Sequence, residues 1–283
     1  MTWFTYSLLG AIFMTAYALS IRLLLKDKGD SKTFTFITTL LGGTFLLFLL
    51  PFEKIIYVFN FQIIIVLFLL SFAFALTDLL FIRGRQLEEV SIVSILIQLG
   101  IFWSLIGGAI IFKEVFTTSK IIAVSLVVLG GILLVWHKQK ITLTKGKYYI
   151  ILATLLFTLC SFVDKQLSSH FSATLYKGLL FIFEAIMLFL FFLPQKFQAI
   201  KKELKIQGKT IILVGPILSL AMVFLVKAFQ SGGEASKVLP VFSLSLVFSV
   251  LAGIIFLKER EHIGKKIISM ILVLIGVFIL QTY

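Results

Sequence analysis

The sequence has few charged residues and only one cysteine, and both shortages narrow the class of protein. Charged residues make up 14% of the 283 residues, whereas hydrophobic residues make up 60%, and the mean hydropathy is +1.11. Soluble domains carry about 25% charged residues, so a soluble globular fold is excluded. Because Cys160 is the only cysteine, an intramolecular disulfide is excluded too, and its place in an apolar run predicts a packing role.

The sequence also lacks the residue clusters that catalysis and metal binding need. His137, His170 and His262 fall in connections between apolar runs, without ligand-like spacing to other histidines, cysteines or carboxylates. There is no G-x-S-x-G motif and no histidine within an apolar run to activate a serine. We therefore expect no enzyme, no metal site and no cofactor.

Long uncharged runs dominate what is present. They cover residues 3–21, 33–52, 55–77, 90–112, 121–136, 148–163, 210–226, 238–257 and 267–283, with a further run at 171–195 that only Lys177 and Glu184 interrupt. Most are close to the roughly 20 residues that a helix needs to cross the hydrocarbon core of a membrane. They are too long and too apolar for barrel strands, so the sequence predicts an all-α integral membrane protein with ten transmembrane helices.

The sequence at the end of one predicted helix occurs twice in the chain, 145 residues apart. "GGAIIFKE" at 107–114 aligns with "AGIIFLKE" at 252–259, and the offset also places Glu89 on Glu234 and Ser91 on Ser236. The repeating unit is a five-helix half, which predicts a first repeat at 1–137, a linker at 138–147 and a second repeat at 148–283. Because five is odd, the second repeat is inverted in the membrane, as in many secondary transporters.

The repeated endings and the fifth-helix segments "VVLGGILLVW" and "LVLIGVFIL" resemble those of the EamA-type members of the drug/metabolite transporter superfamily. The resemblance covers nearly the whole chain. It implies a secondary transporter that exports a small metabolite such as an amino acid or an amine. It does not identify the substrate.

The basic residues predict topology and partners. The net charge is +13, but 19 of the 26 Lys and Arg residues fall in odd-numbered connections, where they meet lipid headgroups, so we expect no nucleic-acid binding. The positive-inside rule places those connections in the cytoplasm and both termini outside, whereas the resemblance implies termini inside. We expect a bacterial cytoplasmic membrane, with membrane lipids and a small-molecule substrate as partners; the oligomeric state is open, a homodimer being one option.

Glu184 is the strongest candidate for a functional residue. It lies near the middle of the run at 171–195, where an ionised carboxylate is costly and by default indicates function. It could attract a cationic substrate or couple transport to protons or another ion. The alternative is an ion pair with Lys227 or Arg22 that only fixes helix packing.

A second group of candidates could line a cavity between the repeats. Asp78 either lines the cavity or pairs with Arg83 or Arg85. Polar residues also recur on one face of the fourth helix of each half, and aromatic residues could close the space. These candidates are Ser91, Ser94, Gln98, Ser243, Tyr17 and Trp103. Glu114 and Glu259, by contrast, are expected to be solvated at helix ends.

Two functions compete for this arrangement. The first is the secondary transporter working by alternating access, with Glu184 as its cation or coupling site. The alternative is a flippase for a lipid or a lipid-linked sugar, in which the basic connections hold phosphate headgroups.

Overall fold

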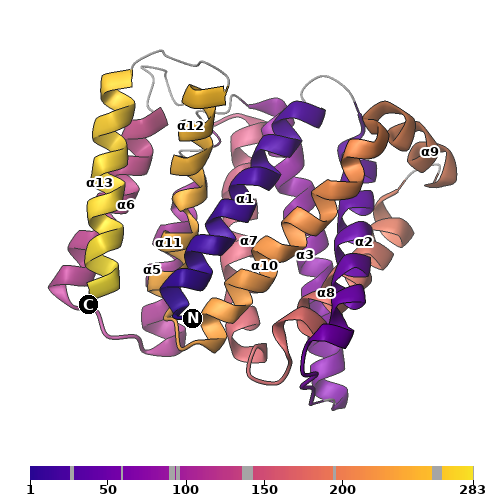
Figure 1. Ribbon diagram of the computed structural model, residues 1–283, viewed down its shortest axis with the longest axis horizontal. Helices are drawn as coiled ribbons and strands as arrows, with labels where there is room; N and C mark the ends of the chain where they lie inside the picture. Colours follow the sequence, from indigo (N-terminus) through magenta and orange to yellow (C-terminus); the bar gives the residue numbers. More distant parts are fainter. Residues whose placement is uncertain are drawn as a thin grey trace.

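The computed structural model describes residues 1–25, 29–58, 60–88, 93, 96–135, 143–193, 196–256 and 263–282, and these ranges are helical apart from short connections (Figure 1). The first half holds α1 (Trp3–Leu25), α2 (Ser31–Leu49), η1 (Leu50–Phe52), α3 (Phe61–Leu87), α5 (Leu99–Phe112) and α6 (Thr118–Val135). The second half holds α7 (Lys145–Leu167), α8 (Ala173–Met187), η2 (Leu188–Phe192), α9 (Lys196–Gln207), η3 (Gly208–Thr210), α10 (Ile211–Gln230), α11 (Ala235–Phe242), α12 (Leu244–Phe256) and α13 (Ile263–Thr282).

The helices confirm the prediction of an all-α membrane protein. Within the described ranges, eight helical segments are long and apolar enough to cross a membrane, and α5 and α6 are shorter apolar helices. Together they account for the ten predicted spans. Both termini lie on the same side of the helix bundle (Figure 1), as an even number of crossings requires. We call this side the termini face.

Packing between the two halves follows the inverted repeat. The second helices pack together as α2 with α8, and the fifth helices as α6 with α13. The first helix of each half packs on the third helix of the other, as α1 with α10 and α7 with α3. Exchanging the halves maps the α2–α8 and α6–α13 contacts onto themselves and the α1–α10 contact onto α7–α3. The repeat therefore governs the tertiary structure and not only the sequence.

The α6–α13 contact depends on glycine. A Cβ atom on Gly276 would lie 2.5 Å from the carbonyl oxygen of Ala123, and one on Gly130 would lie 2.8 Å from that of Ser269. Both neighbours are backbone atoms, which cannot move away by a change of rotamer as a side chain can. Small residues thus let the two helices approach closely, which is a general means of packing helices in membranes.

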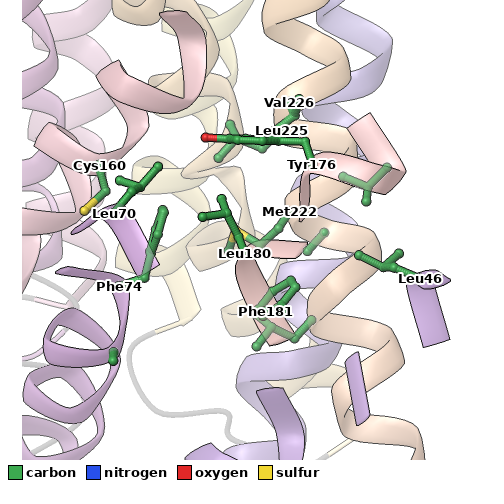
Figure 2. Packing of buried hydrophobic residues seen from close by; sticks show 14 of the residues in the cluster. Leu46, Leu70, Phe74, Cys160, Tyr176, Leu180, Phe181, Met222, Leu225 and Val226 are labelled. Atoms are coloured by element: carbon green, nitrogen blue, oxygen red, sulfur yellow. The ribbon is translucent and has the colours of Figure 1, made fainter. Parts of the chain in front are cut away.

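The core lies between the halves. Figure 2 shows side chains of both halves meeting there, among them Leu46 of α2, Phe74 of α3, Tyr176 of α8 and Met222 of α10. Cys160 of α7 is 3% exposed within this cluster, so the predicted packing role fits its position.

One connection has more structure than its sequence suggested. Residues 195–209 read as a polar connection, but α9 forms there because Ile200, Glu203 and Gln207 share one face of a helix. Glu203 is 1% exposed, and its Oε2 accepts a hydrogen bond of 2.9 Å from the backbone N–H of Asp30, the residue that precedes α2. The helix is therefore anchored to the α1–α2 connection.

Candidate functional site

A cavity of about 160 Å³ lies between the two halves. Its wall comes from α1, α3, α7, α8, α10, α11 and α12, with Ile97 and the start of α5 completing it. Most of the wall is apolar. Its polar and charged members are Tyr17, Asp78, Arg85, Thr154, Thr158, Lys177, Glu184, Ser243, Ser245 and Ser249.

The cavity lies away from the termini face. On α1, which begins at that face, the lining starts at Met14. On α7 and α10, which end there, the lining stops at Thr158 and Met222. On α3 it continues to Arg85, close to the end of the helix at the opposite face. The cavity thus extends from the middle of the bundle toward the opposite face.

Two carboxyl groups meet in the cavity wall. Glu184 of α8 is 3% exposed, and its Oε1 has no hydrogen-bond partner within the described part of the chain. Asp78 of α3 is its electrostatic neighbour and also interacts with Arg85, seven residues further along the same helix. A buried carboxylate without a full set of partners is costly, so this arrangement favours a positively charged or hydrogen-bond-donating guest.

The cavity wall also contains the basic residue Lys177, whose charge is neutralised by Asp164. The Nζ of Lys177 donates to Oδ2 of Asp164 at 2.7 Å, and the hydroxyl group of Tyr176 donates to Oδ1 at 2.7 Å. Lys177 also lies over the ring of Phe74, 4.6 Å from its centroid. Asp164 neutralises Lys177, whereas the carboxyl pair retains unmet capacity to accept.

Sequence comparison now identifies the group of proteins to which this architecture belongs. The model of the EamA-like transporter family matches residues 1–136 and 144–282, which is nearly the whole chain in two parts. The chain belongs to the EamA-like transporter family. It is therefore an integral membrane protein and, in general terms, a drug/metabolite transporter, and EamA-like proteins are transporters rather than enzymes.

Other comparisons add the fold alone. No curated protein matches this EamA-like chain. One solved structure, described only as the crystal structure of a protein, is 11% identical and covers 98% of this chain and 95% of its own, with a TM-score of 0.71. The predicted boundaries of the repeats and linker, at 137 and 147, stay a prediction.

The EamA-like cavity contains four of the eight predicted site residues: Glu184, Asp78, Tyr17 and Ser243. Gln98 and Trp103 are not part of its wall. The Gln98 amide packs against Gly131 of α6, and Gln98 Oε1 has no partner among the described residues. Ser91 and Ser94 lie outside the described residues.

The proposed packing partners of the carboxylates can also be placed. Lys227 pairs with Glu53 at 3.4 Å and so does not neutralise Glu184; the side chain of Arg22 lies outside the description. Arg85, by contrast, does interact electrostatically with Asp78, which is the partner that the second interpretation of Asp78 proposed. Asp78 therefore fits both interpretations, because it lines the cavity and interacts electrostatically with Arg85.

Sequence reasoning missed Arg85 and Lys177 as members of the EamA-like site. A signal was present. Arg85 follows Asp78 by seven residues and Lys177 precedes Glu184 by seven, so each carboxylate shares a helix face with a base. Asp164 carried no such signal, because only the turn that joins the end of α7 to the start of α8 brings it to Lys177.

Proposed function

We propose that this protein is a secondary transporter that exports a small metabolite, such as an amino acid or an amine, by alternating access across a bacterial cytoplasmic membrane. One observation carries the proposal. The Glu184 carboxylate is buried in the cavity wall beside a second carboxyl group, and its Oε1 has no protein partner in the described chain. A cationic group of the substrate, or a coupling proton, supplies what the carboxylate lacks.

The cavity supports distinct roles for its charged residues. Glu184 and Asp78 form the acidic part of the wall that receives a cationic group. Arg85, toward the opposite face, offers a fixed positive charge to an anionic group of the same molecule. Ser243 and Tyr17 add hydroxyl groups that orient the ligand.

The size of the cavity favours a small solute over a lipid. A cavity volume of about 160 Å³ is similar to that of a protein cavity of about 150 Å³ that binds benzene, which suits a small molecule. The flippase alternative is not favoured, because membership of the EamA-like family indicates drug/metabolite transport.

Transport by reconstituted protein tests the proposal. A thermal-shift screen of amino acids and small amines selects a stabilising compound, and its radiolabelled form is then used with proteoliposomes under a proton gradient. Glu184→Gln should abolish gradient-driven accumulation of the compound, because the amide can neither pair with a cationic group nor bind and release a proton. Glu203→Gln is the matched control, because Glu203 is an equally buried carboxylate on α9 that does not line the cavity. Unchanged accumulation by Glu184→Gln would contradict the proposal.

A further inference from the structure

The end of α5 is built to direct one side chain into the second half of the protein. Lys113, the C-cap of α5, has a left-handed φ of 51°, and the backbone N–H of Glu114 donates to the carbonyl oxygen of Gly108 at 3.0 Å. Such a left-handed residue ends a helix and turns the chain. The turn carries the Glu114 side chain away from α5 and toward α7 and α11.

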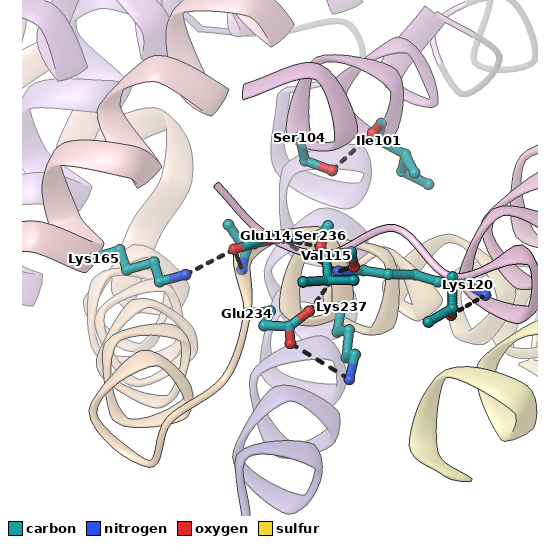
Figure 3. Close-up of polar contacts among 11 residues, drawn as sticks. Ile101, Ser104, Glu114, Val115, Lys120, Lys165, Glu234, Ser236 and Lys237 are labelled. Atoms are coloured by element: carbon teal, nitrogen blue, oxygen red, sulfur yellow. Dashed lines mark hydrogen bonds and ion pairs between the residues drawn. The ribbon is translucent and has the colours of Figure 1, made fainter. Parts of the chain in front are cut away.

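Glu114 caps a helix of the other half. Its Oε1 accepts hydrogen bonds of 2.8 Å from Lys165 Nζ and from the backbone N–H of Ala235, the first residue of α11 (Figure 3). Its Oε2 accepts from both the backbone N–H, at 3.2 Å, and the hydroxyl group of Ser236.

This cap is needed because α11 does not cap itself. Its own N-cap residue, Glu234, makes no side-chain capping bond. The free N–H groups at a helix start attract an anion, and the Glu114 side chain, only 4% exposed, meets that demand from across the repeat boundary. The expectation of a solvated Glu114 was therefore wrong.

A second ion pair surrounds this contact. The buried Lys120 of α6 pairs with Glu234, and its Nζ lies 3.7 Å from Glu114 Oε2. Gly108 leaves room for the carboxylate, since a Cβ atom there would lie 2.7 Å from Oε2. We call Glu114, Lys120, Lys165, Glu234 and Ser236 the latch; Figure 3 shows all five close together.

The latch joins α5 and α6 of the first half to helices that form the cavity wall. Beyond the latched end of α11, this helix and its C-cap residue supply Leu239, Phe242 and Ser243 to the cavity. The α7 helix supplies Thr158 two turns before Lys165. The latch lies at the termini face, beyond the lining residues of α1, α7 and α10. Separating Glu114 from α11 would free a wall helix at this end of the cavity.

We propose that the latch closes the cavity toward the termini face and must open before the cavity can be reached from that face. The inference rests on the proposed alternating access and assigns the closed gate of that cycle. Glu114 is a positioning residue, because it acts through α11 and α7 and does not contact the cavity. Opening the latch exposes a charged lysine and a carboxylate to water, which compensates for part of the lost pairing.

Sided thiol labelling tests the latch without any substrate. A reporter cysteine replaces Ser243 in a Cys160→Ala background, and a membrane-impermeant maleimide is applied to vesicles whose sidedness is read from a tag on one terminus. Glu114→Gln should speed labelling from the termini face about tenfold, because losing charge-assisted hydrogen bonds shifts a two-state equilibrium by about an order of magnitude. Labelling from the opposite face should fall or stay constant. Glu203→Gln, which removes the charge of a buried carboxylate at the other end of the bundle, should change neither rate.

The outcomes separate a gate from a simple structural contact. Faster labelling from both faces alike, or no change from the termini face, would overturn the latch. Ser236→Ala and Lys165→Met each remove one contact and keep the test decisive if Glu114→Gln does not fold; each should raise the same rate by about threefold. The labelling assay does not depend on transport. If Glu114→Gln changes the labelling rate as expected but no compound is transported, the latch is supported and only the proposed function is contradicted.

Discussion

The Nζ of Lys177 lies 2.7 Å from Oδ2 of Asp164, and both side chains are almost completely buried. Asp164→Asn should lower the stability of the protein by about 3 kcal/mol or more, because it leaves an uncompensated buried charge. The double variant Asp164→Leu with Lys177→Met should recover most of the loss, since it removes both charges. Thermal unfolding in detergent measures this; a double variant as unstable as Asp164→Asn would show that the pair is not what limits stability.

The glycine contact between α6 and α13 gives a second stability prediction. Gly276→Ala should lower the unfolding temperature, because the new Cβ atom would lie 2.5 Å from a backbone carbonyl oxygen of α6. Gly264→Ala on the same helix is the control, as no atom of the described residues outside its own helical turn lies within 4 Å of its added Cβ. Equal effects of the two changes would mean that the helices adjust freely.

The latch should respond to acid but not to mild changes of pH. Burial by itself raises the pKa of the Glu114 carboxyl group, but hydrogen bonds from Lys165, Ser236 and Ala235 outweigh it and hold the pKa below its ordinary value of 4.5. Its stabilising effect is therefore complete above about pH 4.5 and is lost as the pH falls through the lowered pKa. The charged groups that face the Glu114 carboxylate are Lys165, which donates to it, and Lys120, which also pairs with Glu234.

Labelling of the Ser243→Cys reporter from the termini face measures this dependence. The rate, corrected for the reactivity of a model thiol, should be constant between pH 7 and pH 5. A marked rise within that range would show that Glu114 does not keep the gate closed in its ionised form.

The repeat extends the latch prediction to the opposite face. Glu259 lies outside the described residues, so this prediction rests on the sequence, where Glu259 aligns with Glu114 and Ser91 with Ser236. If both halves use the same device, Glu259→Gln should speed labelling from the face opposite the termini and slow it from the termini face. The same direction of change as in Glu114→Gln would argue against a symmetric pair of gates.

Sequence patterns could predict the helices but not all of their contacts. The ten spans follow from charge-free runs, because a membrane requires about 20 apolar residues per helix. The α9 helix was missed because its buried face carries Glu203 and Gln207, whose burial depends on Asp30 in a different connection. No local pattern reveals such a contact.

The same limit applies to the site. Glu184 and Asp78 could be found because a carboxylate within a span is costly and rarely without purpose. Gln98 shares a helix face with predicted site residues, yet that face packs on Gly131 of α6 and not on the cavity. Glu114 looked solvated because its helix ends there, whereas its true environment comes from α11, more than a hundred residues later in the chain.

Protection of a cavity cysteine from labelling shows whether the cavity beside Glu184 binds the transported compound. The compound that stabilises the purified protein should slow maleimide labelling of Ser243→Cys in the Cys160→Ala background, and the protection should disappear when Glu184→Gln is added. A cysteine at the exposed Ser169 on the termini face should be labelled equally with and without the compound. Full protection that survives Glu184→Gln, or no protection at Ser243→Cys by a compound that the protein transports, would show that the compound does not bind beside Glu184.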